Sequence, residues 1–158
     1  MSEVVSNVIE MQVRLDASPE VVFPYLVDAE RYARWQGVRA ELDPRPGGVY
    51  RVWMDANMVA SGEYVEVEPH RRVVFTWGWE GDDGVPPGST TVEIVLEPDG
   101  ASTTLTLRHT GLPPGEPVVL HTEGWQFFTG RLAVAVVGRD PGPIPPPPSS
   151  ANDGSRSS

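Results

Sequence analysis

The fold follows from one stretch near the C-terminus, VVLHTEGWQFFTGRLAVAVVG, residues 118–138. Large apolar side chains recur in it at helical spacing, among them Leu120, Phe127 and Leu132, and form a broad apolar stripe. Small residues such as Gly124 and Gly130 stand beside large aromatic ones, which indicates an uneven surface. A lone helix has to bury its stripe against another layer. A curved sheet around one helix tends to leave a cavity, so the stretch predicts a pocket.

The N-terminal part predicts one strand and two short helices. In Ile9–Leu15 apolar residues alternate with polar ones, which is the period of a half-buried strand. Ser18 then suits a helix N-cap and Pro19 the first helical position. Pro24 would cost about 3 kcal/mol inside a helix, so we expect a kink or a very short helix there. The second short helix ends at Trp35.

The chain between Trp35 and the closing helix predicts an antiparallel sheet. Strand-like stretches occupy residues 49–54, 58–68, 73–79, 92–97 and 105–109. Gly62 indicates a bulge or bend, and Asp99-Gly100 is a hairpin signal. Short consecutive strands with tight turns pair antiparallel. The predicted fold class is therefore α+β, with a curved antiparallel sheet around a long C-terminal helix and two short helices near the N-terminus.

The end of the chain differs in composition from the rest. Prolines crowd residues 141–148, and Ser, Asn, Asp and Gly follow them. Such a segment has little to bury, so we expect a disordered tail over residues 140–158, partly in polyproline II conformation. The remainder, residues 1–139, is predicted to form one domain, because a chain of 158 residues with 39% hydrophobic content can bury a sizeable core.

Charge and missing residue types exclude several mechanisms. The formal net charge is −10 and every basic side chain except histidine is an arginine, without a basic stripe, so no nucleic-acid partner is expected. The absence of Lys and Cys excludes Schiff-base and thiol chemistry. No leader is legible, and no stretch approaches the roughly 20 apolar residues of a membrane span. We expect a cytoplasmic protein with no cofactor. The histidines lack metal-ligand spacing, so no metal is expected.

Several motifs follow one another in a familiar order. They are Ser18-Pro19-Glu20-Val21-Val22-Phe23 with Trp35, then Pro46-Gly47-Gly48 and GEYVEVEPHRRVVFTW (residues 62–77), then His109-Thr110-Gly111-Leu112 and Gly124-Trp125. Through them residues 8–138 resemble the activator-of-Hsp90-ATPase-homologue-like family of the START/SRPBCC superfamily. The resemblance implies a helix-grip fold. The superfamily includes lipid and hormone carriers, polyketide cyclases and antibiotic self-resistance proteins, and the fold alone selects none of these functions.

The candidate site residues lie on the predicted inner faces. His109 is the candidate catalytic residue, because strand alternation places it on the same face as Leu105 and Leu107. There it could orient a ligand or act as a base, and a core histidine bonded to a carbonyl or an acid is the alternative. The predicted ligand-binding residues are Trp35, Trp53, Phe75, Trp77, Trp79, His109, His121, Trp125 and Phe128. Aromatic rings of this kind stack on flat apolar ligands.

The orientation of Arg51 stays open at this level. It shares its strand parity with Val49 and Trp53. If that face is concave, Arg51 points into the cavity and pairs with an anionic ligand group. If the face is convex, Tyr50 and Val52 point inward and Arg51 is a surface residue.

Three functions are compatible with these features. The first is a binding protein, a monomer or homodimer, that holds a small hydrophobic or aromatic molecule between sheet and closing helix. The second is a cyclase or hydrolase that uses His109 in the same cavity. The third, suggested by the family name, is an adaptor that contacts a chaperone.

Overall fold

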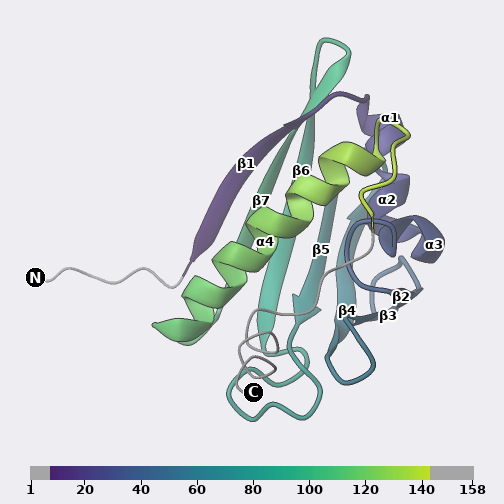
Figure 1. Ribbon diagram of the computed structural model, residues 1–158. Coiled ribbons are helices and arrows are strands. Elements are labelled where there is room, and N and C mark those ends of the chain that lie inside the picture. The colour runs from purple at the N-terminus through teal and green to yellow at the C-terminus, as the bar shows by residue number, and fades with distance from the viewer. Residues whose placement is uncertain (1–7, 143–158) are drawn as a thin grey trace, which may run out of the picture.

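The computed structural model describes residues 8–142 (Figure 1). In chain order its elements are β1 (Ile9–Leu15), α1 (Pro19–Val22), α2 (Pro24–Val27), α3 (Ala29–Tyr32), β2 (Arg39–Leu42), β3 (Val49–Trp53), β4 (Val59–Glu68), β5 (Arg72–Trp77), β6 (Thr90–Asp99), β7 (Ser102–Thr110) and α4 (Glu116–Ala135). All but the first three residues of the predicted tail lie outside the described residues.

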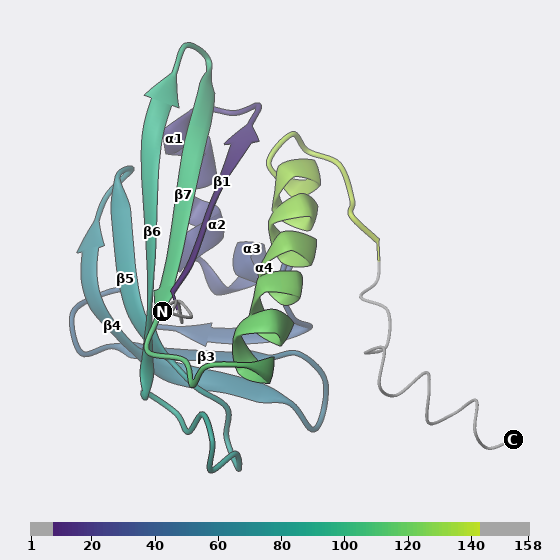
Figure 2. The same ribbon diagram turned by 90° about the vertical axis from the view of Figure 1, so that its left-hand side faces the viewer.

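The strands form one seven-stranded antiparallel sheet in the order β1-β7-β6-β5-β4-β3-β2. The long strands β6 and β7 pair from Thr91 with Thr110 to Asp99 with Ser102, and the predicted Asp99-Gly100 turn connects them. β1 joins the outer side of β7, so the first strand of the chain lies beside the last one. The sheet curves, and α4 crosses its concave face (Figures 1 and 2). The predicted fold class is confirmed.

Pro24 has the effect that its chemistry predicts. It splits the first expected helix into α1 and α2, which meet at Phe23. Each of the two begins with proline at its first position, where the missing N–H costs nothing. α3 follows at once, and the carboxylate of its N-cap Asp28 accepts a hydrogen bond from the N–H of Glu30.

The sequence analysis did not predict one of the strands. β2 (Arg39–Leu42) pairs with β3 at the edge of the sheet. Its alternation of Ala40 and Leu42 with charged residues is present in the sequence, but it covers only four residues and has prolines close behind it. Such a short signal is weak against the surrounding turn residues.

α4 is held across the sheet by side chains rather than by backbone contact. Among the strands its backbone comes close to β1. Between the helix and the central strands lie buried aromatic side chains of the core, Trp125 from the helix and Phe75 and Trp77 from β5. The core of the protein therefore lies between α4 and the concave face. No helix in residues 8–142 is long and apolar enough to cross a membrane.

Gly62 marks a close approach between β4 and β5. A Cβ built on it would lie 2.1 Å from the carbonyl oxygen of Thr76. The register between these strands shifts between Tyr64 and Glu66, close to the bend that the sequence predicts at Gly62. Only a residue without a side chain fits at this position.

We predict that Gly62→Ala destabilises the fold by about 1–3 kcal/mol, the usual cost of forcing extra atoms into a packed site. Gly124→Ala is the matched control, since nothing lies within 4 Å of the added Cβ. Alanine favours a helix over glycine by about 0.5–1 kcal/mol, so this control should be neutral or stabilising. Urea unfolding of both variants measures the difference, and equal stabilities would contradict the packing described.

Candidate functional site

Two histidines and three tryptophans from the sheet and α4 meet in the interior. We call them the histidine–tryptophan cluster: Trp77 at the end of β5, Trp79 two residues beyond it, His109 on β7, and His121 and Trp125 on α4. The ring centroids of Trp77 and Trp125 lie 5.1 Å apart, and those of His109 and His121 lie 5.3 Å apart in an edge-to-face arrangement. The structure thus brings together five of the predicted ligand-binding residues.

Both ring nitrogens of His109 are engaged. Trp125 Nε1 donates to its Nδ1 at 3.0 Å. Its Nε2 lies 2.8 Å from the hydroxyl of Thr90, which itself donates to the carbonyl oxygen of Trp77. An indole N–H only donates, so Nδ1 carries no proton, and Nε2 of the neutral ring donates to Thr90. Sequence reasoning missed Thr90, which nothing but its register opposite Trp77 distinguishes.

His121 adopts the opposite tautomer. Trp79 Nε1 donates to its Nε2 at 2.9 Å, so that nitrogen is unprotonated. Its Nδ1–H donates to the carbonyl oxygen of Pro117, one helical turn earlier, at 2.7 Å. The two indole–imidazole bonds are reciprocal. One runs from a tryptophan of α4 to a histidine of the sheet, and the other from a tryptophan beside β5 to a histidine of α4.

Burial keeps both imidazoles neutral. His109 is 0% exposed, and desolvation, with a smaller effect from nearby His121, lowers the pKa of His109 to about 3. Desolvation also lowers the pKa of His121 below the ordinary histidine value, against a smaller raising effect of its hydrogen bond to Pro117. A ring that already uses both nitrogens and resists protonation is poorly suited to act as a general base at neutral pH.

One polar atom of the cluster has no protein partner. Trp77 is 2% exposed, and its Nε1–H is buried without a hydrogen-bond acceptor among the described residues. A buried donor left unpaired costs about 1–3 kcal/mol. The centroid of its indole ring lies 5.3, 5.9 and 5.1 Å from the ring centroids of Trp79, His109 and Trp125, so the unpaired donor belongs to a central ring of the cluster.

A second buried polar group lies next to the cluster. Tyr32 donates to Oε1 of Gln36 at 2.5 Å, and a short hydrogen bond joins its hydroxyl to that of Tyr50. Since the Tyr32 proton goes to Gln36, Tyr50 is the donor between the two phenols. Burial raises the pKa of both tyrosines well above the ordinary value. These residues were not among the predicted ones, although the alternation of Tyr50 with Arg51 was a usable signal.

The remaining predicted residues lie outside the histidine–tryptophan cluster. Phe75 stacks on Tyr50 with centroids 4.0 Å apart, and buried Trp35 donates from Nε1 to the carbonyl oxygen of Tyr25. Phe128 is half-buried on the flank of α4. Trp53 does not join the group, because it lies on the outer face of the sheet between Arg39 and Arg51, whose guanidinium carbons lie 4.3 and 4.5 Å from its ring.

The structure places Arg51 on the outer, convex face of the sheet, the second of the two orientations that the sequence left open. Its guanidinium makes two hydrogen bonds to the carboxylate of Glu80, at 2.7 and 2.9 Å, on the outer face. Tyr50 and Val52 are the residues of β3 that point inward, and both are fully buried. The inner surface therefore offers no arginine from this strand to an anionic ligand.

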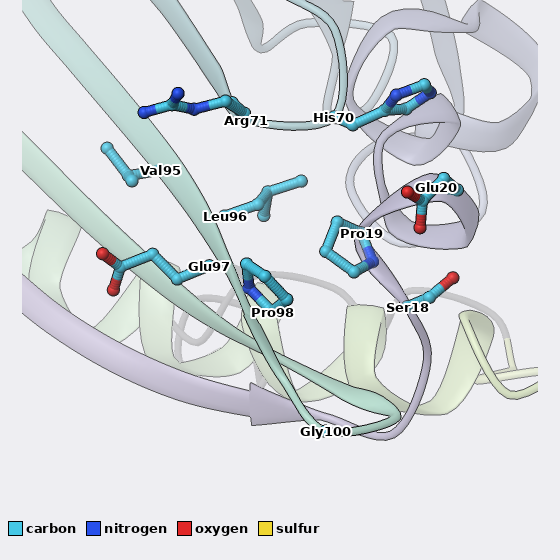
Figure 3. A pocket seen from close by; sticks show the side chains of 10 residues that line it. All are labelled: Ser18, Pro19, Glu20, His70, Arg71, Val95, Leu96, Glu97, Pro98 and Gly100. Atoms are coloured by element: carbon cyan, nitrogen blue, oxygen red, sulfur yellow. The ribbon is translucent and has the colours of Figure 1, made fainter.

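Two hollows lie elsewhere on the surface. A groove of about 750 Å³ runs beside the β6–β7 hairpin and is lined by Ser18 and Pro19, by His70 and Arg71, and by Glu97 and Pro98 (Figure 3). A smaller one of about 170 Å³ lies near Arg72 and Arg108. Neither lies between α4 and the sheet, so a cavity at the cluster stays a prediction. In residues 8–142 no three His, Asp or Glu side chains gather closely enough to hold a metal ion.

Comparison with known proteins agrees with this architecture. A curved antiparallel sheet closed by one C-terminal helix defines a helix-grip protein. The family described as activator of Hsp90 ATPase homolog 1-like protein matches residues 16–136. The chain belongs to this family, as the sequence resemblance indicated. No curated protein matches the chain.

Three solved structures illustrate the similarity. An AHSA1-like protein from Rhizobium etli is 43% identical, with a TM-score of 0.70 over 87% of this chain and 86% of that one. DynU16, a protein in the dynemicin biosynthetic locus, is 28% identical with a TM-score of 0.74 over 86% of this chain, which spans only 49% of that protein. An HSP90 activator from Plasmodium falciparum is 23% identical with a TM-score of 0.68, over 82% of this chain and 95% of that one, and shares the fold.

The neutral histidines predict how stability depends on pH. An unfolded histidine takes up a proton below about pH 6.5, whereas folded His109 stays neutral down to about pH 3. Acid therefore favours the unfolded chain, and the free energy of unfolding should fall by up to about 1.4 kcal/mol per pH unit between about pH 6 and 5. His121 acts in the same direction.

Denaturant unfolding at several pH values tests this dependence. His109→Gln should lower stability overall but flatten the slope, because the titrating group is gone. His70→Gln serves as the control, since His70 is exposed in a turn. If His109→Gln keeps the full slope of the parent protein, the buried neutral state of His109 is wrong.

Proposed function

We propose that this protein binds a small, flat, apolar molecule between α4 and the concave face of the sheet, and that the molecule carries one hydrogen-bond acceptor for Trp77 Nε1. The observation that supports the proposal is the buried indole N–H without a protein partner. A ligand carbonyl or ether oxygen would satisfy this donor and remove the cost of leaving it unpaired. The surrounding rings of Trp79 and Trp125 would stack on the apolar body.

The electrostatics of the cluster favour a neutral ligand. Both histidines are neutral and have their nitrogens engaged, and Arg51 lies on the outer face. A charged group would therefore find no counter-ion among these residues and would lose its hydration, which is costly in an apolar interior.

Access to the cluster would be from the side of Trp79 and His121. Both are only partly buried, whereas Trp77, His109 and Trp125 behind them are almost fully enclosed. Because side chains rather than backbone contacts hold α4 over the central strands, rotation of a few rings would create space there without moving the sheet. The proposal therefore requires a pocket that opens as the ligand enters.

Binding is better supported than the alternatives. Catalysis by His109 would require a free nitrogen, and both are occupied. The HSP90 activator shares only the fold with this chain, so it supplies no argument for a chaperone contact. The name of DynU16 places that protein in a biosynthetic locus, a setting in which a small-molecule ligand is a reasonable expectation for a relative.

A matched pair of ligands tests the proposal. Fluorenone is a flat aromatic ketone, and fluorene has the same rings without the oxygen. We predict that fluorenone shifts the Trp77 indole N–H signal in ¹H–¹⁵N NMR spectra. Trp77→Phe should weaken fluorenone binding about 3- to 10-fold, which corresponds to one neutral hydrogen bond, and should change fluorene binding much less.

Trp53→Phe is the control variant, because Trp53 lies on the outer face between two arginines. It should leave both affinities unchanged. The proposal fails if neither compound shifts signals of the histidine–tryptophan cluster, or if shifts are confined to the outer surface of the sheet.

A further inference from the structure

His121 faces a hydrogen-bond donor and a carboxylate that belong to the same loop. This loop follows β5 and runs from Trp79 to Val85, and the N–H of Trp79 donates to the carbonyl oxygen of Val85 at 2.7 Å, which closes it. Trp79 Nε1 donates to Nε2 of His121. Asp82 lies in the middle of the loop, close enough for its negative charge to act on the imidazole. One short loop thus carries a partner for each charge state of the ring.

The loop itself holds the carboxylate of Asp82 in place. Oδ1 accepts from the N–H groups of Gly84 and Val85 at 2.7 and 3.2 Å. The N–H of Asp82 donates to the carbonyl oxygen of Trp79 at 3.2 Å. Because Oδ1 accepts both of these bonds, Oδ2 is left as an acceptor for another group.

The bond from Trp79 is compatible only with a neutral His121. An indole N–H only donates, whereas a protonated imidazole donates from both nitrogens. Nδ1–H of His121 already donates to the carbonyl oxygen of Pro117, so an added proton goes to Nε2, the atom that accepts from Trp79. Two N–H groups would then face each other across the 2.9 Å that separate the nitrogens. Protonation of His121 and its bond to Trp79 therefore exclude each other.

The groups around His121 determine where its proton is stabilised. The loop contributes the carboxylate of Asp82, and β7 contributes the neutral ring of His109, whose centroid lies 5.3 Å away. On α4 itself, Glu116 and Glu123 lie more than about 130° away from His121 around the helix axis. Among these groups Asp82 is therefore the acid that an imidazolium at this position would meet.

His121 takes up a proton before His109 as the pH falls. Burial lowers the pKa of both rings, but the hydrogen bond to Pro117 and the charge of Asp82 oppose this effect at His121. His109 is 0% exposed, and its pKa lies at about 3. His121 is only partly buried, so water reaches it more easily. There is thus a range of pH in which one of the two histidines is charged and the other is neutral.

We propose that His121 is a proton switch at the entrance to the histidine–tryptophan cluster. The neutral ring accepts from Trp79 and holds the loop against α4. The protonated ring releases Trp79 and donates from Nε2 to the carboxylate of Asp82 instead. Because Trp79 and His121 lie on the side from which a ligand would enter, acid opens this entrance. The opening for a ligand rests on the proposed function, whereas the exchange of partners does not.

The exchange of partners can be measured without a ligand. The ring nitrogens of His121 and the indole N–H of Trp79 are followed in NMR spectra of the full chain, from about pH 8 downward until the protein unfolds. We expect the Trp79 signal to shift with the same midpoint as the His121 ring, while His109 stays neutral. A Trp79 signal that stays in place while His121 takes up its proton would overturn the proposal. A His121 ring that remains neutral until unfolding would do the same.

Asp82→Asn tests the partner of the charged ring. It removes the negative charge but keeps a side-chain oxygen for the N–H of Gly84, so the loop should persist. The midpoint of His121 should fall by about 0.5–1 pH unit, because an attractive charge is lost. Asp83→Asn is the matched control, since Asp83 is the neighbouring exposed acid and the change in net charge is the same. Equal shifts in the two variants would contradict the role of Asp82.

Trp79→Phe tests the partner of the neutral ring. It keeps an aromatic ring and removes the N–H donor, which favours the unprotonated imidazole. The midpoint of His121 should therefore rise by about 0.5–1 pH unit. Trp53→Phe on the outer face is the control and should leave it unchanged. A midpoint that stays the same or falls in Trp79→Phe would show that Trp79 does not keep the proton away.

The rate of ligand entry tests the opening. Association of fluorenone with the full chain should accelerate up to about tenfold per pH unit as the pH falls toward the His121 midpoint, because the protonated fraction rises by that factor. In Trp79→Phe it should already be fast at neutral pH. An association rate of the parent chain that does not depend on pH would refute the opening. If fluorenone binds at no pH while Trp79 still follows His121, the proposed ligand is wrong and the switch stands.

Discussion

Two reciprocal hydrogen bonds between indole and imidazole rings hold this fold closed. Trp125 of α4 donates to His109 of β7, and Trp79 beside β5 donates to His121 of α4. The backbone of α4 stands off from the central strands, so these side chains set the distance and the rotation of the helix. Each bond requires an unprotonated imidazole nitrogen, and burial, which lowers both pKa values, keeps that nitrogen available. The closure of the sheet by α4 thus depends on two neutral histidines.

The same constraint shapes what the site can do. Because Nδ1 of His109 accepts from Trp125 and Nε2 is bonded to Thr90, neither nitrogen of this ring is free, and Nε1–H of Trp77 is the buried donor of the cluster without an acceptor among the described residues. The interior is filled by rings in contact with one another, so the proposed ligand would have to displace side chains. Arg131 plays the corresponding role on the flank of α4, where one buried guanidinium joins the helix to two other segments through the carbonyl oxygens of those segments.

Sequence patterns predicted the architecture and the inner position of His109, because strand alternation and helical spacing follow directly from backbone geometry. These patterns did not show that Trp53 lies on the outer face of the sheet while Trp77 lies on the inner face. Both belong to alternating strands, and the decisive fact for Trp53 is the ion pair between Arg51 and Glu80 on the outer face, a contact between distant segments. The hydrogen bonds between two tryptophans and two histidines could not be predicted from the sequence either, since they depend on how far α4 lies from the sheet. In the sequence Arg131 is a single arginine beside the apolar residues of the closing helix, and its carbonyl partners come from loops that no local pattern places.

The most direct measurement of this closure is the tautomer of each histidine. Long-range ¹H–¹⁵N NMR spectra at about pH 6 distinguish protonated from unprotonated ring nitrogens. The structure predicts a proton on Nε2 but not on Nδ1 of His109, and the reverse in His121. Two rings in the same tautomer, or an imidazolium at either position, would contradict the account.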